Sequence, residues 1–306
     1  HMIVNIYAIP QWSDKMLRNI GKLIRNFIYS LIISLISPRT HPKKHYVSIC
    51  AIFKNEAPYL REWIEFYKII GVDHFYLYNN FSSDDYQKIL KPYIAAGLIT
   101  LTDWPHPHGQ MSAYKHCLDT YKDETNWLGF VDLDEFIVPN RYNDIKEWLQ
   151  KHQKKPSAFV YWKFFSSAGN LTEKSSLVTE TYTIASHFIH TQKTFFNTDW
   201  YGYVQNFHIA HIIKLKYFGV YVPDHPLIYY GFCKNVDELD IQMNHYYCKS
   251  YEYQLHKKIP GGLADKDYKQ YDLSAFYNFE KICSWPDYHI FTYLIKLKLA
   301  LNESSK

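Results

Sequence analysis

Asp132 and Asp134 are the two side chains of this sequence that are best suited to bind a metal ion. They lie near the end of an apolar run, Asn126 to Val138, whose aromatic and β-branched residues are typical of a buried strand. Side chains two residues apart on a strand point to the same face, so the two carboxylates would lie side by side. Carboxylate oxygens are hard ligands that suit Mn²⁺ or Mg²⁺. The spacing therefore predicts a divalent metal site at this position.

Glu135 extends the acidic group by one residue. Carboxylates are costly to bury unpaired, so a cation must accompany them. Short acidic clusters are commonly solvated loops, but the apolar residues on both sides of this cluster favour the metal site. Glu135 either supports the metal ligands from behind or pairs with a nearby lysine or arginine, and the sequence leaves both roles open.

The segments before the acidic run alternate between predicted strands and predicted helices. This β-α-β order indicates a parallel sheet with helices on its faces. Ligands of such sheets bind beyond the carboxyl ends of the strands, and polar clusters follow those ends here. The predicted strands are residues 46–53, 74–78 and 98–101, and the predicted helices are residues 56–70, 86–96 and 111–121.

The polar residues at these strand ends have structural as well as ligand-binding interpretations. Asn55 fits the N-cap of the helix after it, and Asp84 fits a cap of the next helix. Gln110 either faces a ligand or is a solvated helix start. The residues expected to converge on one crevice with the acidic run are Lys54, Asn55, Glu56, Asn80, Asp84 and Gln110.

Beyond Pro139 the alternation loosens, so the second half of the chain is predicted to be mixed. Strands are expected over residues 158–165 and 177–184. Residues 187–207 form a long aromatic-rich loop region, and loops of this length often carry function. An amphipathic helix over residues 288–301 is expected to close the chain.

Residues 14–37 have the periodicity of an amphipathic helix, with four cations in its first half and Pro38 as its end. The apolar part is too short and too often interrupted by serine to predict a membrane span. Residues 15–36 either lie on an anionic bilayer surface or pack on the protein's own domain. We therefore expect residues 1–44 to comprise a cloning remnant, this helix and a linker, ahead of one domain over residues 45–306.

The composition fits a globular protein, since 47% of the 306 residues are hydrophobic. A net charge of +4 does not argue for nucleic acid, and it suits anionic small molecules or an anionic membrane surface. The five cysteines are odd in number and include no Cys-x-x-Cys pair, which argues against a zinc site and favours a reducing compartment. We therefore expect a cytoplasmic protein, at the inner face of the membrane if the first helix binds there.

Short motifs recur along the chain in a characteristic order. They are Ala51 to Glu56, Glu62-Trp63, Tyr78 to Asn80, Gln110, His116-Cys117, Asp132 to Phe136, Asn244 to Tyr246, Lys249-Ser250 and Glu252. In this order they resemble glycosyltransferase family 92 and its bacterial relatives over residues 46–262. The resemblance implies an α/β fold of the GT-A type, with a Rossmann-type, mostly parallel central sheet flanked by helices, here accompanied by N-terminal and C-terminal amphipathic helices. Two positions depart from the family pattern, Asn79 in place of aspartate and Phe165-Ser166 in place of Phe-Gly.

The same resemblance implies a metal-dependent, inverting glycosyltransferase. It would move a hexose, often galactose, from a UDP-sugar to a saccharide or glycolipid acceptor such as a bacterial surface glycan. Asp134 would be the direct ligand of Mn²⁺ or Mg²⁺, whereas Asp132 would contact the ribose or a metal-bound water. A divalent ion there would act as a Lewis acid on the diphosphate leaving group.

The far end of the chain supplies the predicted closing ligand of the metal, His245, with Lys249 behind it for the diphosphate. His225 is the alternative metal ligand. Lys54, Asn55 and Glu56 would hold the uracil and ribose. The full set of residues predicted to bind the donor is Lys54, Asn55, Glu56, Asn80, Asp84, Gln110, Asp132 and Lys249.

An inverting transfer also needs a carboxylate base for the acceptor hydroxyl, and the sequence singles out none. Glu180 is the first candidate, with Asp199 and Asp224 as alternatives. Two other functions stay open. Metal-dependent phosphodiester cleavage would need further ligands for a second metal. A non-catalytic glycan-binding module would use some of the eight tryptophans, most of which we expect in the core.

Overall fold

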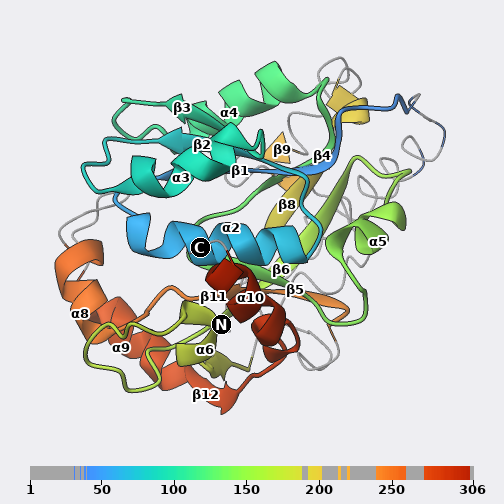
Figure 1. Ribbon diagram of the computed structural model, residues 1–306. Coiled ribbons are helices and arrows are strands. Elements are labelled where there is room, and N and C mark those ends of the chain that lie inside the picture. The colour runs from blue at the N-terminus through green and yellow to red at the C-terminus, as the bar shows by residue number, and fades with distance from the viewer. Residues whose placement is uncertain are drawn as a thin grey trace, which may run out of the picture.

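The computed structural model describes residues 40–187, 192–201, 213–214, 219–220, 239–259 and 272–303, together with Leu31, Leu35 and Pro38. Its centre is an eight-stranded sheet in the order β3-β2-β1-β4-β8-β6-β11-β5, with helices packed against it (Figure 1). In that order the strands are β3 (Ile99–Asp103), β2 (His74–Asn79), β1 (His45–Phe53), β4 (Thr125–Phe130), β8 (Gln192–Asn197), β6 (Ser157–Phe164), β11 (Ile241–His245) and β5 (Glu135–Pro139).

The remaining elements surround this sheet. Two small sheets pair β9 (Ile213–Lys214) with β10 (Gly219–Val220) and β7 (Ile184–Ser186) with β12 (Cys283–Pro286). The helices are α2 (Ala57–Ile69), α3 (Tyr86–Ala95), α4 (Gln110–Tyr121), α5 (Ile145–Gln150), α6 (Val178–Thr181), α8 (Tyr251–Tyr253), α9 (Leu273–Ile282) and α10 (Phe291–Glu303). A 3₁₀ turn covers Thr198–Trp200, and a π-helical turn, Gln254–Lys258, directly continues α8.

The first half of the chain forms the parallel part of the sheet. β1 pairs in parallel with β2 and with β4, and β2 pairs in parallel with β3. β1 is buried along residues 47–53, so it reads as a continuous apolar run rather than an alternating one. The predicted α/β class, with a large central sheet flanked by helices, is confirmed.

Both faces of β1 are covered by hydrophobic side chains. Ile49 and Ala51 belong to one core cluster together with Trp63 of α2. Cys50 belongs to a second cluster together with Tyr114 of α4. The closing helix predicted from the sequence is α10, which lies beside α2 (Figure 1). Residues that alternate along β1 thus meet different helices, as expected for a strand in the middle of a doubly covered sheet.

The second half of the chain is mixed, as predicted. β8 lies antiparallel between β4 and β6. β11 is parallel to β6 and antiparallel to β5. The expectation of an uninterrupted loop region over residues 187–207 is wrong, because residues 192–197 are strand β8 of the central sheet. Its aromatic residues are buried, which accounts for the composition that suggested a loop.

The predicted single strand from Asn126 to Val138 is two strands. β4 ends at Phe130, residues 131–134 form a turn, and β5 begins at Glu135. β4 pairs with β1 in the interior of the sheet, whereas β5 pairs with β11 at its edge. The chain must therefore cross from one place in the sheet to the other between the two strands. The two aspartates therefore lie in a turn and do not share one face of a strand.

The strand predicted over residues 177–184 is wrong in most of its length, because α6 occupies Val178–Thr181. A buried carboxylate explains the helical turn. Glu62 of α2 accepts hydrogen bonds of 2.9 Å from the backbone N–H groups of Val178 and Thr179. These are donors at the start of a helix, which has no partners of its own for them.

The amphipathic helix predicted over residues 14–37 lies outside the described residues except for Leu31 and Leu35, whose side chains are exposed. Among the helices that the structure describes, none combines the length and the apolar character needed to cross a membrane.

Candidate active site

The turn between β4 and β5 is closed by two hydrogen bonds between Asp132 and the first residue of β5, Glu135. The N–H of Glu135 donates to the carbonyl of Asp132 at 3.1 Å, and the N–H of Asp132 donates to Oε2 of Glu135 at 2.8 Å. Helix α2 supports the turn from the core. Trp63 Nε1 donates to the backbone carbonyls of Asp132 and Glu135 at 3.1 and 3.2 Å. The Tyr67 hydroxyl donates to the backbone carbonyl of Glu135 at 3.0 Å. The acidic side chains are thus presented on a rigid backbone.

Asp132 uses both of its carboxylate oxygens within the protein. Oδ1 accepts from the Tyr114 hydroxyl at 2.9 Å and from Gln110 Nε2 at 3.2 Å, while Oδ2 accepts from Lys193 Nζ at 2.7 Å. The structure therefore brings Gln110 to the acidic turn. Tyr114 lies one turn further along α4, and four residues is the spacing at which helical side chains share a face.

Lys193 of β8 is the cation that the buried acids require. Its ammonium also lies 3.4 Å from Oε2 of Glu135, and both side chains are almost fully buried. Burial alone would lower the pKa of Lys193, but Asp132 and Glu135 raise it above its ordinary value. Burial raises the pKa of Glu135 well above its ordinary range. Both roles left open for Glu135 have a counterpart in the structure, since its Oε2 accepts from the N–H of Asp132 and also lies next to Lys193.

Asp134 faces the other side of the turn, toward residues from the far end of the chain. Its Oδ1 lies 3.5 Å from His245 Nε2, and its Oδ2 lies 3.1 Å from Lys258 Nζ. Burial would raise the pKa of Asp134, but Lys258 and His245 hold it well below its ordinary value. The N–H of Tyr246 donates to the Asp134 carbonyl at 2.8 Å, which ties the end of β11 to the turn.

The Asp134–His245 pair fits the geometry of two ligands of one metal ion. Ligands of one ion at about 2.1 Å lie roughly 3 Å from each other, close to the 3.5 Å observed between Oδ1 and Nε2. Asp132 does not complete the set, because its oxygens are engaged by Lys193, Tyr114 and Gln110. Within the described part of the chain, no group of three or more histidine, cysteine and acidic side chains is arranged to hold a metal. Two protein ligands suffice for an ion whose other ligands are phosphate oxygens and water.

Lys249 does not reach the acidic turn, although it was predicted to act there. Its ammonium is buried 3.3 Å from the ring centroid of Tyr59 and 4.3 Å from that of Tyr253. Among the described residues it has no hydrogen-bond partner, and burial lowers its pKa to about 8. The lysine from this end of the chain that contacts the turn is Lys258, which the sequence analysis missed. Its one local sign was the pair of adjacent cations, Lys257 and Lys258.

The segment after β1 contacts this same lysine pair and the turn after β2. Lys257 Nζ lies 2.6 Å from the carbonyl of Asn55 and 2.5 Å from Oε1 of Glu56. Asn55 has a positive φ of 54°, and its side-chain oxygen accepts from the N–H of Ser83 at 2.7 Å. The N-cap expected at Asn55 is wrong, because Glu56 occupies that position of α2. Lys54 precedes this contact region and is half-buried.

Asp84 caps a helix, but not the one expected. Its Oδ2 accepts from the N–H of Ala57 at 2.8 Å, at the first residue of α2. The cap predicted on the following helix is therefore wrong, and Asp85 stands at the N-cap of α3. Asp84 thereby joins the segments after β1 and β2, which is what places Asn55 and Glu56 beside the crevice.

Asn80 is buried, and its amide is used inside the protein. Its Nδ2 donates to the carbonyls of Trp104 and His106 at 2.8 and 2.9 Å, which holds the loop after β3. Asn79, where the family pattern has aspartate, donates to the Tyr86 hydroxyl and to Asp103, each at 2.9 Å. These contacts give both asparagines a structural role at the strand ends.

The predicted base candidates do not gather at the acidic turn. Glu180 lies on α6 and forms a partly exposed ion pair of 2.5 Å with Lys298 of α10. Asp199 pairs at 2.9 Å with Lys43, just before β1, so it lies near the first residues of β1 and β4, whereas the acidic turn follows the last residue of β4. Asp224 and the alternative ligand His225 lie outside the described residues.

Comparison with known proteins shows what the chain is similar to. The sequence profile of glycosyltransferase family 92 matches residues 43–274. A family 92 protein of Oryza sativa is 30% identical over 115 residues, 37% of this chain and 20% of that protein. One of Arabidopsis thaliana is 35% identical over 94 residues, 30% of this chain and 16% of that protein. The beta-1,4-galactosyltransferase galt-1 of Caenorhabditis elegans is 32% identical over 117 residues, 34% of this chain and 28% of that protein. This chain spans less than a third of each of these relatives.

Solved structures share part of the fold at low similarity. The crystal structure of Staphylococcus aureus TarS 1-349 covers 54% of this chain and 49% of its own, with 14% identity and a TM-score of 0.36. Glucosyl-3-phosphoglycerate synthase from Mycobacterium tuberculosis, solved with Mn²⁺, UDP and glucosyl-3-phosphoglycerate, covers 39% of this chain and 44% of its own, with 17% identity and a TM-score of 0.29. At this level of similarity nothing about ligands follows for the present chain.

Proposed function

Because the chain belongs to glycosyltransferase family 92 and is a glycosyltransferase, we propose that it transfers a hexose from a UDP-sugar by a metal-dependent, inverting reaction. The observation that carries this proposal is the pairing of Asp134 with His245, 3.5 Å apart beside Lys258. A carboxylate, an imidazole and a buried ammonium in one crevice suit a complex of a divalent ion with a diphosphate.

The residues around the turn divide the work of binding such a donor. Asp134 and His245 would hold the ion, which when bound offsets the negative charge that grows on the diphosphate as the glycosidic bond breaks. Lys258 keeps Asp134 ionised and offers an ammonium next to it. Lys193 and Tyr114 hold the Asp132 carboxylate in place at the turn, where its lone pairs not used by them would face hydroxyl groups of the donor.

UDP-galactose is the donor that we propose. Support comes from the sequence resemblance to family 92 and from two relatives whose names specify galactosyl transfer, the C. elegans beta-1,4-galactosyltransferase and a galactan beta-1,4-galactosyltransferase of A. thaliana. The proposed acceptor is a saccharide or glycolipid. We propose that the enzyme acts in the cytoplasm, where nucleotide sugars are available.

A panel of nucleotide sugars, scored for UDP release with Mn²⁺ and with EDTA, tests the proposal. We expect UDP-galactose to give the fastest release and EDTA to abolish it. Equal release in EDTA would contradict the metal dependence, and faster release from another nucleotide sugar would contradict the donor. The anomeric configuration of the product, read by proton NMR, separates inversion from retention.

A further inference from the structure

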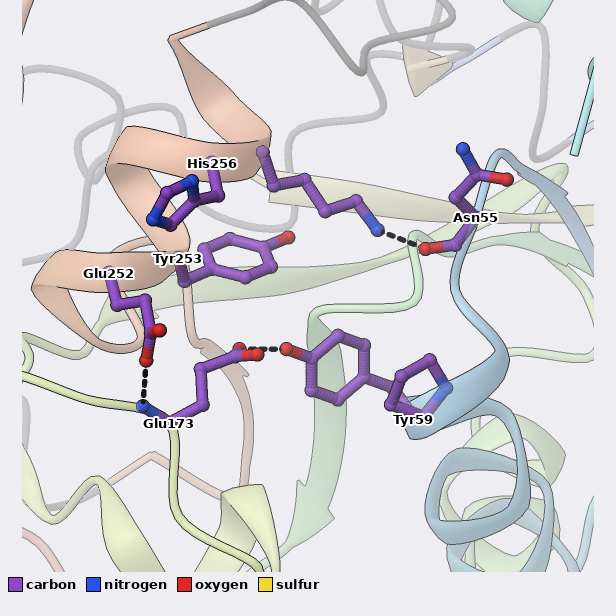
Figure 2. Close-up of a pocket in the computed structure, with 8 residues that line it drawn as sticks. Asn55, Tyr59, Glu173, Glu252, Tyr253 and His256 are labelled. Carbon is purple, nitrogen blue, oxygen red and sulfur yellow. Dashed lines mark hydrogen bonds between the residues drawn. The ribbon is translucent and has the colours of Figure 1, made fainter. Parts of the chain in front are cut away.

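A pocket of about 270 Å³ opens between α2 and the segment formed by α8 and its π-helical continuation. Figure 2 shows Tyr59 reaching into it from α2, Glu252 and His256 from the helix opposite, and Glu173 from the loop before α6. This volume is near the lower end of small-molecule sites, so it suits one sugar-sized ring better than a nucleotide.

The polar side chains of the pocket form a connected set. The Tyr59 hydroxyl donates to Oε1 of Glu173, and the N–H of Glu173 donates to Oε2 of Glu252 at 3.0 Å (Figure 2). Lys257 also lines the pocket, but its ammonium is already bonded to the Asn55 carbonyl and to Glu56. Among the described residues, neither Glu173 nor Glu252 forms an ion pair. The pocket therefore carries two carboxylates that form no ion pair among the described residues, since the nearest cations are engaged elsewhere, Lys257 by Glu56 and Lys249 against the rings of Tyr59 and Tyr253.

This charge decides between the possible ligands. A phosphate would be repelled by Glu173 and Glu252, since like charges at close range are unfavourable. Sugar hydroxyls, by contrast, are donors, and carboxylates are their strongest acceptors among protein side chains. The rings of Tyr59 and Tyr253, which also line the pocket, supply apolar surface for the C–H groups of a sugar.

The pocket is connected to the acidic turn through one short segment. Tyr253 lies in it, Lys257 borders it, and the next residue, Lys258, contacts Asp134. We propose that this pocket is a subsite for a neutral sugar ring of the acceptor, whose hydroxyls donate to Glu173 and Glu252. This inference rests on the proposed glycosyl transfer and adds the part of the site that recognises the acceptor.

Saturation-transfer NMR on the full chain tests the subsite without any turnover. The ligands are three neutral disaccharides (lactose, cellobiose and maltose), with glucuronate as the anionic comparison and glucosamine as the cationic one. We expect at least one neutral disaccharide to bind and glucuronate to give no signal. In the double variant Glu173→Gln, Glu252→Gln we expect the Kd of that disaccharide to rise about tenfold, because hydrogen bonds to charged acceptors become neutral ones.

Asp123→Asn is the matched control, since it removes an exposed carboxylate far from the pocket, and the sugar Kd should not change. The affinity for UDP with Mn²⁺ should also be unchanged in the double variant. The inference is overturned if no neutral disaccharide binds, if glucosamine binds in preference to all three, if the double variant keeps the wild-type Kd, or if UDP affinity falls in parallel. Failure of the proposed transfer would show separately, as the absence of UDP release from every nucleotide sugar.

Discussion

Asp134 is held between two groups that carry or can acquire a positive charge, so its replacement has two separable effects. Asp134→Ala should abolish UDP release, because it removes a proposed metal ligand. It should also lower the thermal midpoint, because it leaves the buried ammonium of Lys258 unpaired, at a cost of about 3 kcal/mol or more. Activity assays and thermal melts in parallel measure the two losses.

A double variant separates them. Asp134→Asn combined with Lys258→Met should recover most of the thermal midpoint, because no unpaired charge remains, while UDP release stays absent. Substantial UDP release by either Asp134 variant would refute the assignment of Asp134 as a ligand.

Lys249 should make the free energy of unfolding depend on pH, and the direction of this dependence follows from the burial of its ammonium. Its pKa is lowered to about 8, below the ordinary value of 10.5, so the unfolded chain holds this proton more tightly. Stability should therefore rise between pH 8 and about pH 10.5 through this group, by up to about 3 kcal/mol. Lys249→Met should lack this rise and should be more stable than the wild type at pH 7. Denaturant unfolding of both proteins between pH 7 and 10.5 measures the difference, and parallel curves would disprove it.

At the scale of the elements, Asp84 gives the simplest test of how the crevice is built. Asp84→Ala removes the acceptor for the first N–H of α2 and should cost about 1 kcal/mol. The adjacent Asp85→Ala is a matched control, because Asp85 makes no side-chain cap hydrogen bond at α3. Urea unfolding compares the two. If Asp84 also binds the uracil, the Asp84 variant alone will weaken UDP binding. Equal unfolding midpoints for the two variants would contradict the capping role of Asp84.

The elements also show what could be read from the sequence. The alternation from β1 to β4 was predictable because each strand and helix there has its own hydrophobic period and pairs with near neighbours. Three features could not be predicted from the local sequence, because they depend on contacts with residues far along the chain. They are the division of β4 from β5, the helical turn at α6 and strand β8. Glu62 accepts hydrogen bonds from the start of α6, and β5 pairs with β11 rather than continuing β4. The predicted pair Asp134 and His245 does meet, but Lys193 and Lys258 had no local signal that linked them to the turn.

At the scale of the whole molecule, the segment that precedes the domain provides a test of membrane association. We expect residues 15–36 to bind anionic vesicles through four cations and an apolar stripe. The variant Lys15→Ala, Arg18→Ala, Lys22→Ala, Arg25→Ala should float with phosphatidylserine vesicles several-fold less than the wild type. Its rate of UDP release should be unchanged. Equal flotation of both proteins would show that this segment is not the anchor.

The pairing of Asp134 with Lys258 joins residues 124 positions apart, and that of Asp132 with Lys193 joins residues 61 apart. During synthesis the acidic turn is therefore complete long before the lysines that neutralise it have left the ribosome. Contacts of such long sequence separation form late, because the loops that they close are entropically costly. We infer that the site is assembled in the last steps of folding, and that the nascent chain passes through a stage in which its first four strands are paired while three clustered carboxylates still lack their cations.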